Sequence, residues 1–205
     1  MKNKSIFSFF VLPFTLAAAL PADAVSQQII RPQRLIRGST SQAKLSLFDS
    51  AAWITHADLA DEIHPKALRI VRFKCPFKVE DASASFEIDV SADERFYLSC
   101  DGKFIGRGPH RGTENNWMFQ SYRLNLEKGD HVIEAVVWKH SDGNAPLAQL
   151  SVRLGFALAA SGKYAQRLTT GVAPWSAGIV EGVSDNGYIV NGPWGTGAQN
   201  KAVGA

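Results

Sequence analysis

The chain has few cysteines, no strong excess of charge of one sign and no helical periodicity of useful length. Its 205 residues include 2 cysteines, and 22 Lys and Arg residues stand against 19 Asp and Glu residues, a net charge of +3. The basic residues are scattered along the chain, so nucleic acid is a poor candidate for a partner. Helical bundles are disfavoured because no long segment repeats its apolar residues at the helical spacing.

Common motifs of enzymes and cofactor sites are also missing. The sequence contains no Gly-x-Ser-x-Gly elbow, no Walker loop and no His-Glu-x-x-His pair. Two cysteines alone do not provide the spacing of a zinc site. His56 and His64, with Asp58, Asp61 and Glu62 between them, are more typical of a solvated acidic loop than of a metal cluster. We therefore expect no metal and no cofactor.

The start of the chain has the pattern of a secretory signal peptide about 24 residues long. Lys2 and Lys4 precede an apolar stretch at residues 6–20, and Ala22 and Ala24 supply the small residues of a cleavage site. The apolar stretch is short for a membrane-spanning helix, which needs about 20 apolar residues. We expect a secreted or periplasmic chain without membrane contact after cleavage.

The two cysteines fall on the apolar faces of expected strands. Cys75 shares its face with Phe73 and Phe77, and Cys100 shares its face with Leu98. In an oxidising compartment two cysteines can form a disulfide, whereas buried free thiols pack as small apolar side chains. We favour free thiols and keep a Cys75–Cys100 disulfide as the alternative.

A hairpin is predicted around the dipeptide Asp101-Gly102. Two runs with alternating apolar residues, Arg95–Cys100 and residues 103–107, flank this dipeptide. A two-residue loop requires positive φ at both central positions, which Asp and Gly tolerate at the lowest cost. Since every second residue of the first run is apolar, we expect a half-buried antiparallel hairpin.

Further alternating runs surround the hairpin and predict an all-β fold. Pro76 cannot donate a hydrogen bond to a sheet, so it indicates an edge position or a bulge. Short strands separated by turn residues at this spacing are typical of an antiparallel β-sandwich. The additional strands are predicted at residues 68–79, 83–90, 117–126, 131–138 and 147–158.

The composition divides the chain into four parts. We expect the signal peptide at residues 1–24, a polar leader or short edge segment at 25–44, the sandwich at 45–159 and a Gly-rich tail at 160–205. The tail is a linker, the opening of a further module, or a segment that wraps the sandwich.

Three segments carry a resemblance to a known family. They are LSLFDSAAWITHAD at residues 45–58, SADERFYLSCDGKFIGRGP at 91–109 and YRLNLEKGDHVIEAVVW at 122–138. Together they resemble the N-terminal jelly-roll, galactose-binding-like domain of α-L-rhamnosidase-like glycoside hydrolases. The resemblance covers about residues 45–159 and implies a jelly-roll accessory domain. In that family the catalytic carboxylates lie in a separate helical barrel, which this chain does not contain.

Sugar binding is the function that the residues themselves offer. The segment PHRGTENNW collects hydrogen-bonding and aromatic side chains at an expected rim of the sandwich. Asp93 and Glu94 lie where turns and strand starts place carboxylates, so structural roles are favoured over glycosidase catalysis. The candidate carbohydrate-binding residues are His110, Arg111, Glu114, Asn115, Asn116 and Trp117.

These observations lead to one expected function and two alternatives. The resemblance implies a non-catalytic accessory or carbohydrate-binding module of a secreted α-L-rhamnosidase-like glycoside hydrolase. Its partner is then a carbohydrate or the catalytic domain of the hydrolase. The alternatives are a periplasmic protein-interaction sandwich without a sugar site, and a fragment of a larger hydrolase. Catalysis by this chain alone is disfavoured.

Overall fold

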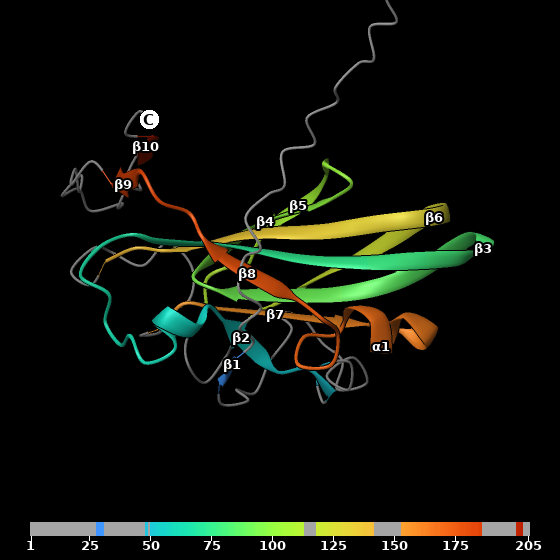
Figure 1. Ribbon diagram of the computed structural model, residues 1–205, viewed down its shortest axis with the longest axis horizontal. Helices are drawn as coiled ribbons and strands as arrows, with labels where there is room; N and C mark the ends of the chain where they lie inside the picture. Colours follow the sequence, from blue (N-terminus) through green and yellow to red (C-terminus); the bar gives the residue numbers. More distant parts are fainter. Residues whose placement is uncertain are drawn as a thin grey trace, which may run out of the picture.

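The computed structural model describes residues 28–30, 48, 50–112, 118–141, 153–185 and 200–202. Antiparallel strands dominate these residues and the helices are short (Figure 1), so the predicted all-β fold is confirmed. The helices are η2 (Ala57–Leu59), η3 (Gly162–Tyr164) and α1 (Ala165–Leu168). The strands are β1 (Gln28–Ile30), β2 (Trp53–Thr55), β3 (Arg69–Asp93), β4 (Arg95–Cys100), β5 (Lys103–Gly108), β6 (Gln120–Lys139), β7 (Gly155–Ala160), β8 (Ser176–Ile179), β9 (Val183–Asp185) and β10 (Asn200–Ala202).

The long strands β3 and β6 form one antiparallel ribbon that folds back on itself. Residues 69–79 of β3 pair with residues 129–139 of β6, and residues 83–90 pair with residues 120–127. The register shifts between the two halves, between Val79 and Ser83. Figure 1 shows both strands running toward one end of the molecule and returning. The two halves of the ribbon therefore lie in different layers.

Other strands extend each half of the ribbon into a sheet. The first layer has the order β8-β3-β6-β4-β5 and contains the first half of β3 and the second half of β6. The second layer has the order β6-β3-β7-β2-β1 and contains the other halves. Two facing antiparallel layers bury their inner side chains between them. The predicted antiparallel β-sandwich is confirmed.

Alternation along β3 separates the core from the solvent. Phe73 and Cys75 are fully buried, whereas Arg72 is exposed and Lys74 is half-buried. Strand β8 pairs with β3 only as far as Lys74. Pro76 therefore lies at a local edge, where a residue without an N–H donor is tolerated. This position agrees with the prediction from the sequence.

The sandwich extends beyond residue 159, where the sequence analysis placed its end. Tyr164, Leu168 and Trp175 belong to the main buried cluster. The indole N–H of Trp175 donates a hydrogen bond to the carbonyl oxygen of Leu168 at 2.8 Å. Strand β8 then pairs with β3. This packing corresponds to the alternative in which the tail wraps the sandwich, and it places the boundary of the folded unit beyond β8, because a few large apolar side chains dock this Gly-rich segment onto the core.

The beginning of the chain is described only in part. Strand β1 lies within the predicted polar leader and pairs with β2 at the edge of the second layer, as a short edge segment. The signal peptide predicted at residues 1–24 lies outside the described residues, so export stays a prediction. The helices in the described part of the chain lack the length and the apolar character that a membrane span requires.

Candidate functional site

The turn between β4 and β5 sets the position of the candidate site. Asp101 and Gly102 have φ values of 50° and 73°, as the predicted two-residue turn requires. Asp101 Oδ1 accepts a hydrogen bond from the backbone N–H of Val132 at 2.8 Å, and the backbone N–H of Asp101 donates to Val132 O at 2.9 Å. The turn is therefore fixed to β6 beside His131.

A groove opens between the β4–β5 hairpin and the first half of β6. Its volume is about 610 Å³, within the range of small-molecule sites. Strand β5 and the first half of β6 end different layers, so the groove runs along an open edge of the sandwich. It is lined by Cys100, Asp101, Lys103, Phe104, Ile105, Tyr122, Arg123, Leu124, Asn125, Leu126, Glu127 and His131.

Two glycine residues in β5 allow the side chains of Tyr122 and Gln120 in β6 to lie against the β5 backbone. A Cβ atom on Gly106 would overlap the Tyr122 ring, and one on Gly108 would overlap the amide of Gln120. The Tyr122 hydroxyl donates a hydrogen bond to Gln120 Oε1 at 2.8 Å. Burial raises the pKa of Tyr122 to about 12. Tyr122 therefore forms a neutral wall of the groove.

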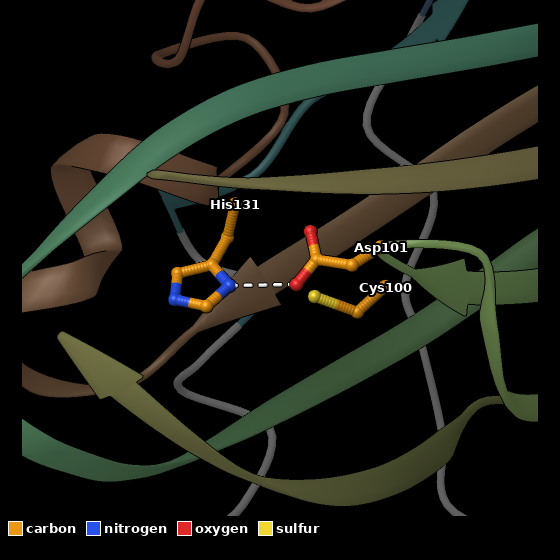
Figure 2. A group of neighbouring side chains, drawn as sticks. All are labelled: Cys100, Asp101 and His131. Atoms are coloured by element: carbon orange, nitrogen blue, oxygen red, sulfur yellow. Dashed lines mark hydrogen bonds and ion pairs between the residues drawn. The ribbon is translucent and has the colours of Figure 1, made fainter. Parts of the chain in front are cut away.

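Cys100, Asp101 and His131 form a cluster in this groove (Figure 2). The cysteine sulfur, a carboxylate oxygen and a ring nitrogen all lie within 4.8 Å of one another. His131 Nδ1 lies 2.7 Å from Asp101 Oδ2, and His131 Nε2 lies 2.9 Å from the carbonyl oxygen of Glu127. Cys100 is buried, while Asp101 is exposed and His131 half-buried. The cluster thus joins the hairpin turn to β6.

The hydrogen bonds of His131 fix its charge state. Both ring nitrogens face oxygen acceptors, and both donate only when the ring carries two protons. The hydrogen bond to Asp101 raises the pKa of His131, although burial opposes it. Burial acts to raise the pKa of Asp101, but the hydrogen bonds from His131 and Val132 hold that pKa below its ordinary value. The pair is therefore an imidazolium and a carboxylate at mildly acidic pH.

The cluster does not have the geometry of a nucleophilic catalyst. A catalytic cysteine needs a histidine nitrogen that takes its proton, but Asp101 and Glu127 engage both nitrogens of His131. Burial raises the pKa of the Cys100 thiol to about 12, opposite to the shift of an activated thiolate. The three side chains instead offer sulfur, oxygen and nitrogen atoms in the arrangement of metal ligands. The sequence alone did not identify these three side chains as a group.

The predicted carbohydrate-binding loop lies only partly within the described residues. His110 and Arg111 are exposed directly after β5, and neither is among the described residues that line the groove. The structure therefore does not bring these two residues to the cluster. The other predicted members lie outside the described residues and stay predictions: Glu114, Asn115, Asn116 and Trp117.

Asp93 and Glu94 are buried at the end of β3. Asp93 Oδ1 lies 3.5 Å from Lys139 Nζ, and both of these side chains are almost fully buried. Burial raises the pKa of Asp93 to about 8, against the opposing effect of Lys139. Glu94 Oε2 accepts a hydrogen bond from the backbone N–H of His140 at 3.1 Å. These contacts give both carboxylates a structural role between β3 and the end of β6.

Cys75 and Cys100 are both free and buried. Both lie opposite Ile133 of β6, Cys75 on β3 and Cys100 on β4. Neighbouring strands lie about 4.8 Å apart, which places the two Cα atoms about 10 Å from each other. A disulfide requires a Cα separation below about 7 Å. The sheet register therefore excludes the disulfide that the sequence analysis kept as an alternative.

The acidic loop between β2 and β3 contains local structural contacts. His56 Nδ1 accepts a hydrogen bond from the backbone N–H of Asp58 at 3.2 Å. Both carboxylate oxygens of Glu62 accept hydrogen bonds from the Arg69 guanidinium, at 2.6–3.1 Å. These local contacts agree with the interpretation as a solvated loop.

Two aromatic rings lie exposed on the hairpin. Tyr97 is 42% exposed and Phe104 is 57% exposed, and their ring centroids are 5.0 Å apart. Phe104 also lines the groove. Rings with one open face beside polar side chains suit ligands that have both apolar and hydroxylated surfaces. Neither ring was predicted to bind a ligand, although their exposure follows from their place on the polar face of the hairpin.

Comparison with known proteins gives a structural match. No protein-family model and no curated protein sequence matches the chain. A solved structure with a similar fold is the family GH78 rhamnosidase of Bacillus sp. GL1, with a TM-score of 0.54 and 22% sequence identity. The match covers 65% of this chain and 14% of the rhamnosidase. The chain thus spans a small part of that enzyme's length, and the similarity shows a shared fold.

Proposed function

We propose that the chain is a non-catalytic accessory sandwich of an α-L-rhamnosidase-like glycoside hydrolase, and that its groove binds carbohydrate. The accessory role is supported by the sequence resemblance over residues 45–159 and by the fold shared with a GH78 rhamnosidase. Carbohydrate binding rests on a single observation, the groove with the exposed Phe104 ring at its side.

The groove offers the groups that recognise a sugar. A pyranose presents an apolar face, which packs on an aromatic ring, and hydroxyl groups, which take hydrogen bonds around it. Phe104 supplies the ring, and Lys103 and Asn125 supply hydrogen-bond donors at the lining. Arg123 Nη2 lies 3.2 Å from Glu87 Oε1, which orients the guanidinium at the edge of the groove. The ligand class that fits is a neutral or mildly acidic glycan.

The electrostatics of Asp101, a carboxylate of the groove, favour binding without cleavage. A glycosidase needs a general acid whose pKa is raised, so that it is protonated when it meets the leaving group. In the lining, Asp101 has the opposite shift, because His131 and Val132 donate hydrogen bonds to its ionised form. Asp101 is therefore unsuited to the role of the acid.

Affinity electrophoresis of the full chain in gels with plant or bacterial polysaccharides tests the binding. We expect at least one polysaccharide to retard the wild-type protein. Phe104→Ala removes the stacking ring and should weaken binding about tenfold, equivalent to about 1.4 kcal/mol. Ile63→Ala is the matched control, since Ile63 is a similarly exposed apolar residue, 48% exposed, and it does not line the groove.

Three results would contradict parts of this proposal. A wild-type protein that no polysaccharide retards would reject carbohydrate binding. Turnover of an aryl rhamnoside by the purified chain would reject the non-catalytic role. Loss of binding in Trp117→Ala with normal binding in Phe104→Ala would move the sugar site to the loop at residues 110–117.

A protein-interaction role is the second candidate, and one observation favours it. Tyr97, Phe104 and Val132 are exposed apolar side chains, the last 39% exposed, on and beside the hairpin. Exposed apolar residues gathered in this way are typical of docking surfaces. In that case polysaccharides would leave the protein unretarded, and Tyr97→Ala would weaken calorimetrically measured binding to a rhamnosidase-like catalytic domain.

A further inference from the structure

We propose that Cys100, Asp101 and His131 form a binding site for a divalent transition-metal ion of the zinc type, open to the groove. The proposal rests on the geometry of these three side chains and does not depend on carbohydrate binding. Their ligand atoms lie within 4.8 Å of one another and point toward one another in Figure 2.

The ligand types select the metal. A cysteine sulfur and an imidazole nitrogen suit zinc, whereas calcium and magnesium prefer sites made of oxygen atoms alone. Cys100, Asp101 and His131 supply one sulfur, one oxygen and one nitrogen. Zinc accepts sites in which three protein side chains bind the ion and a fourth position is open to water or to a small molecule. The groove provides room for this fourth position.

The second nitrogen of His131 is already held as a metal-bound histidine requires. A metal-ligating histidine usually donates its other ring N–H to a carbonyl or a carboxylate, which fixes the tautomer and the ring orientation. His131 Nε2 lies 2.9 Å from the carbonyl oxygen of Glu127. This contact directs Nδ1 toward Asp101 and Cys100, so the ring needs no rotation to bind a metal.

The metal would replace protons that now lie between the ligands. His131 Nδ1 and Asp101 Oδ2 are 2.7 Å apart and share a hydrogen bond. Ligands of a tetrahedral zinc ion with bonds of about 2.0 Å are about 3.3 Å apart. The pair therefore has to separate by about 0.6 Å, which a partly exposed aspartate at a turn allows. Binding also releases the thiol proton of Cys100, as metal binding to cysteine requires.

The second cysteine of the chain provides a matched control. Cys75 is buried and free like Cys100, and both lie opposite Ile133. Among the described residues, Cys75 belongs to no group of metal-ligand atoms. A metal signal that comes from a nonspecific thiol would depend on both cysteines. A signal from the proposed site depends on Cys100 alone.

Titration of the reduced full chain with Co²⁺, followed by absorbance, tests the proposal. We expect one Co²⁺ per chain with a thiolate-to-cobalt charge-transfer band in the wild type and in Cys75→Ala. Cys100→Ala should abolish the band. In calorimetry with Zn²⁺, His131→Asn should weaken binding by more than the roughly 10- to 100-fold that loss of an outer-shell contact costs.

The proposal is overturned if excess Co²⁺ gives the wild type no charge-transfer band and Zn²⁺ gives no heat. It is equally overturned if the band survives in Cys100→Ala or disappears in Cys75→Ala while circular dichroism shows a folded protein. Asp101→Asn, whose side chain is largely at the surface, decides the matter if Cys100→Ala fails to fold. A Zn²⁺ affinity in Asp101→Asn equal to that of the wild type would overturn the site.

Discussion

His131 connects two parts of the sandwich through one charged side chain. Its ring contacts the carboxylate of Asp101 at the hairpin turn and the backbone of Glu127 in β6. Because these contacts need the doubly protonated ring, the joint between β4 and β6 depends on pH. The charge on this residue therefore stabilises the fold as well as shaping the groove.

Replacement of His131 by Gln should destabilise the protein in a pH-dependent manner. The pKa of His131 is raised in the folded state, so its contribution is complete below the unfolded value of about 6.5 and is lost as the pH rises through the folded pKa. The pKa of Asp101 is lowered, so its contribution is lost only as the pH falls through that folded value. The difference between wild type and variant should be largest at about pH 5 and smaller at about pH 9.

Thermal unfolding at several pH values measures this difference. Solvent screens the exposed Asp101, so we expect about 0.5–1 kcal/mol at the maximum. His110→Gln is the control, because His110 is exposed and its loss should leave the pH profile unchanged. A difference that is independent of pH, or that grows toward alkaline pH, would contradict an ionic contact at this position.

The conformation of a single residue could be predicted from the sequence where its own chemistry and that of its neighbours along the chain decide it. Positive φ at Asp101 and Gly102 follows from the two residues themselves. The proximity of Cys100 to His131 does not follow from local sequence, because it needs the pairing of Cys100 with Ile133 across strands that are far apart in the sequence. The same register excludes the disulfide. A sequence pattern gives the face on which a cysteine lies but not the strand that faces it.

At the scale of elements, the hairpin and the folded ribbon are what position the groove. The hairpin follows from alternation and from its turn residues. Separate strands were predicted at residues 117–126 and 131–138, but β6 continues from one to the other, because β3 pairs with β6 on both sides of the bend. A bend in a paired ribbon and a true turn have similar compositions, so local residues do not separate them.

Gly102→Ala tests the strength of the hairpin turn. Gly102 has φ of 73°, and no atom lies within 4 Å of the position that a Cβ would take. The expected loss of stability is therefore the backbone strain of an alanine in the left-handed region of φ and ψ, about 1 kcal/mol. Urea denaturation should show this loss. Gly102→Asn should lose less, because asparagine tolerates positive φ, and equal losses in both variants would contradict a purely conformational origin.

For the whole molecule, the core extends into a part of the chain that composition alone assigned to a tail. The sandwich class was predicted from periodic strands at residues 68–158. Wrapping of the sandwich by the tail was one of three alternatives, but strand β8 itself was not predicted, because it is short and surrounded by glycine and small residues. Trp175 was the available signal, since a large aromatic residue in such a segment is seldom left without a packing partner.

Trp175→Ala should therefore destabilise the sandwich strongly. Trp175 is fully buried, its ring centroid is 5.3 Å from that of Phe156, and its indole donates to Leu168. We expect a loss of about 3–5 kcal/mol in chemical denaturation. Val172→Ala is the control from the same segment, because Val172 is 46% exposed and should cost less than about 0.5 kcal/mol. Small losses of stability of the same size in Trp175→Ala and Val172→Ala would contradict the docking of this segment.

An amide NMR titration of the isotopically labelled chain with rhamnose-containing oligosaccharides tests the central claim most directly. If the groove binds carbohydrate, saturable shifts should concentrate at residues 103–105 and 122–127, which line it, and the oligosaccharide should stay intact. Shifts that appear nowhere, that gather only at residues 110–117, or that accompany cleavage of the oligosaccharide would contradict the account.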